Sequence, residues 1–189
     1  MKKVLFTGLV VAGTLAGLGG AAEAASLASG RKLEVKVDPK KVEEEKTALW
    51  QRFGGWCAIS EWHPSITKCE ESKEGDAAFR TLTLKDGGTI KEKLLERSNV
   101  SYRYAIVASP LPVKNYEAQF SIVPDDDDED EVNVAWAATF DAEGKPDKEA
   151  RAVIDSIFKA GLDNIKAQLA KSSEGKADGG DSDGDKDKE

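Results

Sequence analysis

The stretch DKEARAVIDSIFKAGLDNIKAQLAK, residues 147–171, decides the fold class. Its apolar residues recur three and four positions apart, which places them on one face of a long α-helix, with charged residues on the other face. Pro146 precedes the stretch, and Asp147 is a suitable N-cap. The apolar face includes two small residues, Ala150 and Gly161. Against a curved sheet these residues would leave a cavity, whereas in an ordinary core helix they would be tight packing contacts. The sequence leaves both interpretations open.

Upstream of this helix, several segments alternate apolar and polar residues with the period of a β-strand. Between the first and second of them, Asp38-Pro39 predicts the start of a helix and Gly54-Gly55 its end, and a second short helix precedes Pro64. This order predicts an α+β fold, in which a curved antiparallel sheet of about seven strands surrounds the long C-terminal helix. The predicted strands cover residues 31–37, 78–84, 89–96, 100–107, 116–122 and 132–140.

The turn Asp86-Gly87-Gly88 separates two of these strands and predicts a β-hairpin. A three-residue loop would place Leu84 opposite Ile90. This register keeps the apolar residues of both strands on one face of the sheet.

The first 24 residues have the features of a cleaved export signal. Lys2 and Lys3 precede an uncharged run over residues 4–22, and Ala22-Glu23-Ala24 resembles a cleavage site. An uncleaved anchor is the alternative. We expect a periplasmic protein with no integral membrane segment after signal removal, because no second apolar run is long enough to span a bilayer.

The rest of the chain is expected to contain one domain. We assign residues 25–30 to a flexible N-terminus, 31–171 to the α+β domain and 172–189 to an acidic disordered tail.

Cys57 and Cys69 are the only cysteines, and in an oxidising compartment they are expected to form a disulfide. Their spacing is far from that of a Cys-x-x-Cys redox motif. Since His63 is the only histidine, a zinc site with several histidine ligands is excluded. No cofactor is expected.

The formal net charge of −8 is concentrated in two places. Residues 125–131 are seven consecutive carboxylates, and residues 171–189 hold three more acidic than basic residues, so the remainder is nearly neutral. No basic stripe suited to nucleic acid is present in the sequence. The acidic loop is most simply a hydrated loop. Its alternatives are weak cation binding by Asp125, Asp126, Asp127 and Asp128, or docking to a basic periplasmic protein.

Several short motifs give the sequence a resemblance to a known superfamily. In order they are Trp50…Phe53-Gly54-Gly55-Trp56, Trp62-His63-Pro64, Arg80-x-Leu-x-Leu, Asp86-Gly87-Gly88 with Glu92, Tyr102-x-Tyr, Ser109-Pro110-Leu111-Pro112-Val113 and Asn115-Tyr116. Over about residues 31–170 the chain resembles the SRPBCC (START-like, helix-grip) superfamily. Within it, the exported polyketide cyclase/dehydrase-like proteins, which include the MxaD-type proteins of periplasmic methanol oxidation, are the most similar. The resemblance implies an apolar cavity between sheet and helix, without fixing a ligand.

Arg80 and Glu92 are expected to point into the core from adjacent strands, because each shares a face with apolar residues. They are either a polar anchor for a ligand carboxylate or hydroxyl, or an ion pair satisfied within the protein. Tyr102 and Tyr104 lie on the same predicted face and can add hydroxyl groups.

His63 is the one candidate for catalysis, as a general acid/base, and it can equally be a packing residue or a ligand hydrogen-bond donor. The other expected pocket residues are Trp62, Trp136, Phe158 and Gly161. Because groups suited to chemistry are few, we expect a non-catalytic exported protein that binds a small apolar or amphipathic ligand. An accessory protein that docks to a periplasmic redox enzyme and a cyclase/dehydratase-type enzyme are the alternatives.

Overall fold

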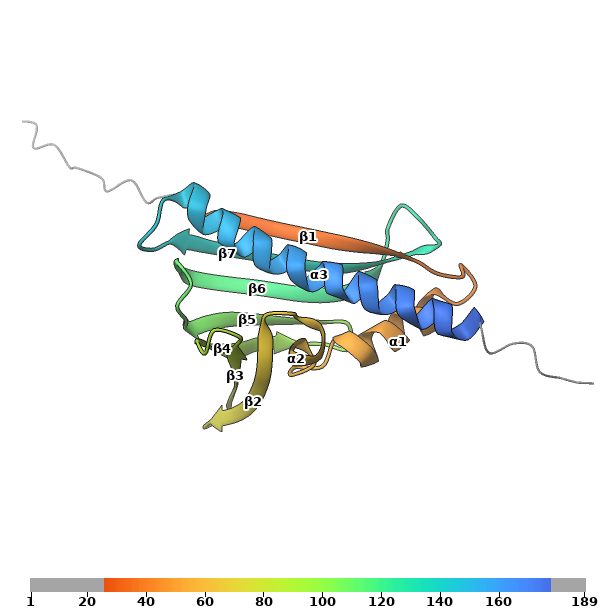
Figure 1. The fold of residues 1–189 in the computed structure, drawn as a ribbon. Helices are drawn as coiled ribbons and strands as arrows, with labels where there is room; N and C mark the ends of the chain where they lie inside the picture. Colours follow the sequence, from red (N-terminus) through yellow and green to blue (C-terminus); the bar gives the residue numbers. More distant parts are fainter. Residues whose placement is uncertain (1–25, 178–189) are drawn as a thin grey trace, which may run out of the picture.

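The computed structural model describes residues 26–177 of the chain, so the expected signal peptide and most of the expected tail lie outside the described residues. Figure 1 shows the elements. In chain order they are β1 (Leu27–Lys36), α1 (Val42–Phe53), α2 (Ile59–Trp62), β2 (Ile66–Glu74), β3 (Ala77–Leu84), β4 (Thr89–Arg97), β5 (Ser101–Ala108), β6 (Val113–Pro124), β7 (Glu131–Ala142) and α3 (Asp147–Ala177).

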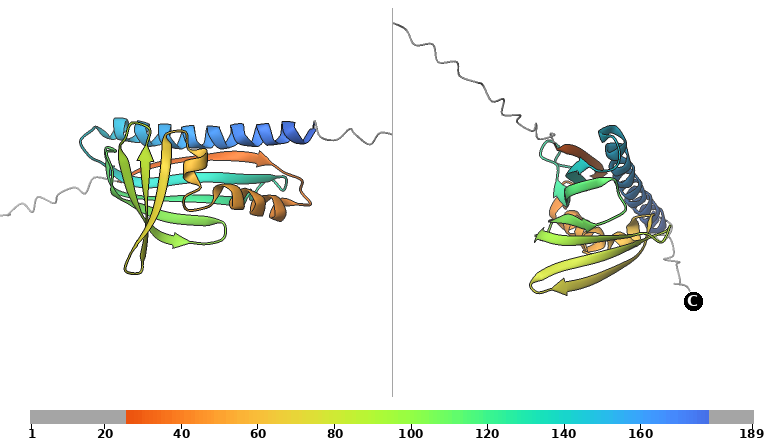
Figure 2. Two further views of the ribbon diagram at one scale, coloured as in Figure 1. Left: turned by 60° about the horizontal axis from the view of Figure 1, so that its bottom comes forward. Right: turned by 90° about the vertical axis from the view of Figure 1, so that its left-hand side faces the viewer.

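The strands form a single seven-stranded sheet in the order β1-β7-β6-β5-β4-β3-β2, and every neighbouring pair is antiparallel. The first strand therefore pairs with the last, while the others follow chain order. Figure 2 shows α3 lying along one side of the sheet and the sheet curving around it. This is the predicted START-like arrangement of a curved sheet, a long C-terminal helix and two short helices. Within residues 26–177, no helix combines the length and the apolar character needed to cross a bilayer.

The periodic face of α3 packs into the core as its spacing predicts. Its fully buried apolar residues are Ala150, Ile154, Phe158 and Ile165. Opposite them, buried residues alternate with more exposed ones along much of β6 and β7, and the most deeply buried are Phe120, Ile122, Val132, Val134, Trp136 and Phe140.

Both ends of the domain extend further than the sequence indicates. Residues 27–30, expected to be flexible, belong to β1 and pair with β7, with Leu27 opposite Phe140. The Arg151 guanidinium donates to the Ala28 carbonyl at 2.8 Å, which also holds this segment against α3. At the other end α3 runs to Ala177, past the expected boundary at residue 171.

The helix after β1 starts later than the sequence predicts. Asp38 accepts hydrogen bonds from the backbone of Lys40, through Oδ1, and of Lys41, through its carbonyl oxygen. These bonds close a turn before the helix, so α1 begins at Val42 rather than beside Pro39. Gly54 ends α1, as predicted.

The edge strand β2 has no counterpart among the strands predicted from sequence. Beyond Ile66 and Cys69 its residues are exposed, so it lacks the alternation of a strand with one buried face. Charged residues are typical of an edge strand, because they discourage pairing with another chain. The expected disulfide is present: Cys69 on β2 is joined to Cys57, with their Cα atoms 5.5 Å apart, and this ties the edge strand to the segment before α2.

The β3–β4 hairpin has a different register from the predicted one. Leu82, rather than Leu84, lies opposite Ile90, and Arg80 lies directly opposite Glu92. The Leu84 N–H instead donates to the Gly88 carbonyl at 2.8 Å and closes a longer loop. Because the shift is an even number of residues, each side chain stays on its predicted face.

Candidate functional site

A cavity of about 510 Å³ lies between the curved sheet, α2 and the N-terminal half of α3. That volume is in the range of ordinary small-molecule sites. The lining residues are mostly aliphatic or aromatic: Ile59, His63, Ser65, Ile66, Leu82, Leu84, Ile90, Glu92, Tyr104, Ile106, Leu111, Tyr116, Trp136, Ala152, Val153, Ile154, Ser156 and Ile157. Ser65, Ala152 and Ser156 are the exposed ones. The cavity therefore meets solvent between the start of β2 and α3.

Gly161 does not border this cavity, contrary to the cavity interpretation of the small residues on α3. A Cβ atom at this position would lie 2.9 Å from His63 Cδ2 and from Trp62 Cζ3, and 3.1 Å from Trp136 Cζ3. The glycine thus lets three rings approach the helix backbone. Ala150 is also fully buried and outside the lining set. Both small residues are tight packing contacts, and the cavity lies beside other residues of the same helix.

The other aromatic candidates divide between cavity wall and packed core. Trp136 lines the cavity, whereas Phe158 stacks on its ring at 4.5 Å between centroids and lies behind it. Trp62 stacks on Phe120 at 5.4 Å and donates its indole N–H to the Phe53 carbonyl at 3.1 Å. Trp62 and Phe158 therefore support the wall without reaching the cavity.

Arg80 and Glu92 form a buried ion pair, with Arg80 Nε 2.5 Å from Glu92 Oε2. Arg80 is fully buried, and Nη1 donates to the Trp56 carbonyl. Its guanidinium carbon lies 3.9 Å from the centroid of the Trp56 ring, 5.1 Å from that of Tyr104 and 5.5 Å from that of Tyr102. Three aromatic faces thus enclose the cation.

The two members of the pair differ in their access to the cavity. Glu92 lines it, and Arg80 does not. Burial raises the pKa of the Glu92 carboxyl, and the adjacent Arg80 works against that rise. Burial disfavours the charge on Arg80 and is the largest single effect, but Glu92, Tyr102 and Tyr104 together outweigh it and raise the pKa of Arg80. Arg80 therefore stays charged and is the internal partner of Glu92.

The predicted tyrosines also separate. Tyr104 lines the cavity, and its hydroxyl accepts a hydrogen bond from Trp136 Nε1 at 2.8 Å. Tyr102 is buried between Trp56 and Phe120, outside the lining set. Tyr116, which the sequence analysis named in a motif but not as a pocket residue, joins Tyr104 on the wall. The alternation of Tyr116 with Ala118 and Phe120 along β6 could have indicated that its side chain faces the core. Burial raises the pKa of both cavity tyrosines, so they are neutral hydroxyls.

His63 is on the cavity wall, but both of its ring nitrogens already have partners. Nε2 lies 3.1 Å from the Ile157 carbonyl, which can only accept, so Nε2 carries the proton. Nδ1 accepts from the Ser65 backbone N–H at 3.2 Å. Burial lowers the pKa of the imidazole from its ordinary value of 6.5, and the bond to Ile157 only partly opposes this. His63 is thus a neutral linker between α3 and the start of β2, which is the packing role rather than the acid/base role.

The neutral state of His63 makes stability depend on pH. The window lies between the lowered pKa of His63 in the folded protein and its ordinary pKa of 6.5. In this window the unfolded chain binds more protons than the folded protein, so the free energy of unfolding falls as the pH falls. The contribution is up to about 1.4 kcal/mol per pH unit. Urea unfolding at a series of pH values measures this effect. Between neutral and mildly acidic pH, the free energy of unfolding should decrease less in His63→Gln than in the parent chain. Parallel curves for the two proteins would contradict this assignment.

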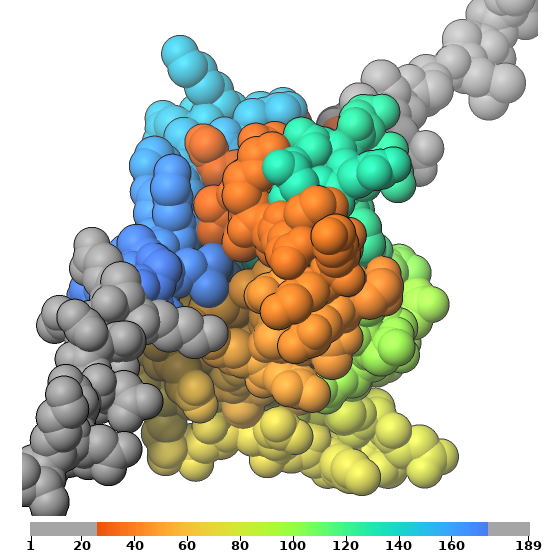
Figure 3. All heavy atoms as spheres, turned by 90° about the vertical axis from the view of Figure 1, so that its right-hand side faces the viewer, coloured from red at the N-terminus to blue at the C-terminus, as the bar shows by residue number. Residues whose placement is uncertain are grey.

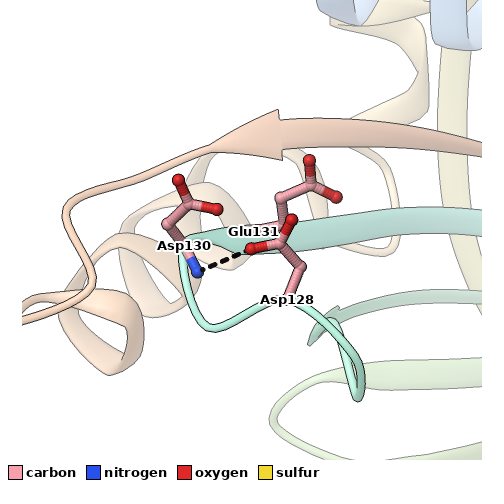
Figure 4. A group of neighbouring side chains, drawn as sticks. All are labelled: Asp128, Asp130 and Glu131. Atoms are coloured by element: carbon pink, nitrogen blue, oxygen red, sulfur yellow. Dashed lines mark hydrogen bonds between the residues drawn. The ribbon is translucent and has the colours of Figure 1, made fainter.

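Two lysines of the same chain pair with part of the acidic loop. Lys36 Nζ, on β1, lies 2.7 Å from Asp130, 2.9 Å from Glu131 and 3.2 Å from Asp128. Figure 4 shows these three carboxylates, which are close enough to form a cation site. Of the four predicted cation ligands only Asp128 belongs to this group, and the lysine ammonium already provides its cation. In Figure 3 the loop (turquoise) lies beside the chain that leads from β1 into α1.

Asp125, the one partly buried residue among the four predicted cation ligands, has a structural role of its own. It accepts hydrogen bonds from Asn133 Nδ2 at 2.5 Å and from the backbone of Asp127 at 2.9 Å, and Lys32 lies 3.5 Å away. These contacts lower the pKa of Asp125, chiefly through the bond from Asp127. Lysines and amides of the same chain therefore relieve part of the repulsion among the carboxylates of the loop.

Comparisons with known proteins agree with this fold. The model of the family described as polyketide cyclase / dehydrase and lipid transport matches residues 14–170. The solved structure of XoxI from Bacillus cereus is 24% identical, with a TM-score of 0.66 over 77% of this chain and 97% of that one. No curated protein matches the chain.

Two more distant structures share the fold. The ZhuI aromatase/cyclase from Streptomyces sp. R1128 is 11% identical, with a TM-score of 0.58 over 78% of this chain and 95% of that one. A START superfamily protein from Mycobacterium smegmatis is 12% identical, with a TM-score of 0.55 over 78% of this chain and 99% of that one. Since the family model spans most of the sequence, the chain belongs to the family described as polyketide cyclase / dehydrase and lipid transport, and its fold is START-like.

Proposed function

We propose that this protein holds a small apolar or amphipathic ligand in the cavity between sheet and α3. The observation that carries the proposal is the cavity itself: about 510 Å³, walled mostly by aliphatic and aromatic side chains, with a few polar groups at fixed positions. Such a composition suits a ligand that is mainly hydrocarbon and has one polar end. The family description, which includes lipid transport, supports the same reading.

Binding is favoured over cyclase- or dehydratase-type catalysis by the state of the polar groups on the wall. General acid/base chemistry needs a group that can exchange a proton near the operating pH and reach the substrate. His63 uses both nitrogens for backbone contacts, and Glu92 is paired with Arg80. Tyr104 and Tyr116 hold their protons because burial raises their pKa values.

We also propose that residues 1–24 are a signal peptide and that the protein acts in the periplasm. The Cys57–Cys69 disulfide supports this location, because disulfides persist in oxidising compartments.

The accessory-protein alternative rests on the MxaD-type resemblance and on docking of a basic redox enzyme to the acidic loop. The likeness to XoxI supports the fold. Pairing with Lys36 offsets part of the loop's negative charge and so weakens its attraction for a basic partner. We therefore place this function second.

Titration with Nile red, an uncharged apolar dye, tests the binding function. We expect saturable fluorescence enhancement with one dye per chain, and displacement of the dye by octanol. Enhancement that rises without saturation, or a dye that octanol does not displace, would contradict a binding cavity.

A further inference from the structure

We propose that the cavity selects ligands whose polar end is an uncharged hydrogen-bond donor, such as a hydroxyl group, and that Glu92 accepts that hydrogen bond. This inference rests on the proposed binding function and specifies the ligand class. It departs from the sequence expectation, which allowed a ligand carboxylate as well as a hydroxyl.

Glu92 is the only charged side chain among the residues that line the cavity, within the part of the chain that the structure describes. No lysine or arginine is in that set. The side chain is 5% exposed, so it is largely shielded from bulk water. A ligand in the cavity therefore meets one buried anionic group and no cation.

The Glu92 carboxylate has unused capacity to accept hydrogen bonds. Oε2 accepts from Arg80 Nε, and in residues 26–177 no protein donor bonds to Oε1. An ionised carboxylate can accept about four hydrogen bonds. A hydrogen bond to a charged group contributes more than one between neutral groups, so a ligand donor that reaches Oε1 gains by supplying that bond.

Arg80 cannot take the opposite role of an anchor for an anion. It is fully buried and outside the cavity lining, and the Trp56, Tyr102 and Tyr104 rings enclose its guanidinium. Two of its nitrogens bond to Glu92 and to the Trp56 carbonyl, and Nη2, which has no partner in the described part of the chain, is buried as well. A ligand carboxylate would thus lose its hydration and approach another carboxylate. The hydroxyls of Tyr104 and Tyr116 can donate to the oxygen of an alcohol, but they bring no positive charge.

Three probes with the same alkyl chain separate the contributions. Octanol has a donor, octyl methyl ether has an acceptor without a donor, and octanoate is an anion at pH ~8. In displacement of Nile red, octanol should bind about tenfold more tightly than the ether, because it supplies one additional hydrogen bond. Octanoate should bind more weakly than both. Octanoate binding as tightly as octanol would overturn the inference, because the head group would then lie at the mouth or near a cation.

Variants assign the preference to Glu92. In Glu92→Gln the advantage of octanol over octanoate should shrink at least tenfold. Since that variant leaves Arg80 without its counter-charge, the double variant Arg80→Leu with Glu92→Leu removes both charges. In it, octanol and the ether should bind equally. Glu96→Gln, the same change at an exposed position on β4, should keep the parent ratios.

The outcomes separate the inference from the function on which it rests. If Nile red and all three probes fail to bind the parent chain, the proposed function is wrong. If they bind and the double variant keeps the tenfold preference for octanol over the ether, only the role of Glu92 is wrong.

Discussion

Replacing Arg80 with methionine is expected to lower the free energy of unfolding by about 3 to 5 kcal/mol. The substitution leaves the Glu92 carboxylate buried without its counter-charge and removes a guanidinium packed against the Trp56 ring. Urea unfolding at neutral pH measures the loss. A decrease of less than about 1 kcal/mol, the level of an exposed ion pair, would contradict the buried pair.

Two further variants show that the loss comes from isolating a charge. Arg80→Met combined with Glu92→Leu should recover most of the stability, because a buried ion pair can be replaced by apolar residues at little cost. Arg103→Met breaks exposed contacts with Glu96 and Glu117 and should cost less than about 1 kcal/mol.

Filling the cavity should abolish binding without unfolding the protein. Val153 is half-buried and lines the cavity from α3, so Val153→Trp places a large ring in space that a ligand needs. We expect the affinity for Nile red to fall about 100-fold, or about 2.7 kcal/mol. The matched control is Val107→Trp on β5, where the parent valine is 50% exposed and outside the lining set. Equal affinities in the two variants would place the dye elsewhere.

The face of each core strand could be predicted from sequence, because alternation in a strand reports directly on burial. Arg80 and Glu92 were assigned inward-facing positions on this basis, and both are buried. Their exact pairing was not predictable, since it depends on how the Gly87-Gly88 loop closes. The loop closure moved the register by two residues and made the pair direct neighbours.

The edge of the sheet and the ends of the domain could not be read in the same way. β2 has only one fully buried residue, Ile66, so it carries almost no hydrophobic period. The start of β1 is fixed by pairing with β7, a contact between residues more than 100 positions apart, such as Leu27 and Phe140. The local pattern of apolar and polar residues cannot predict such a contact.

The location of the cavity was the main error, and its cause is physical. A small residue on a buried helix face either leaves space or admits a bulky neighbour, and the sequence of the helix is identical in both cases. At Gly161 the rings of Trp62, His63 and Trp136 take the space. The cavity instead results from the curvature of the sheet, which separates Leu82 and Ile90 from Ile154 on α3.

The central claim is that the ligand lies inside this cavity, and intermolecular nuclear Overhauser effects between octanol and protein methyl groups test it most directly. The account predicts contacts from the alkyl protons to the methyl groups of Ile59, Leu82, Ile90 and Ile154, which line the cavity from four different elements. Contacts confined to the exposed methyl groups of Leu95 and Val107 would contradict it, because they would place the ligand on the outer surface of the sheet.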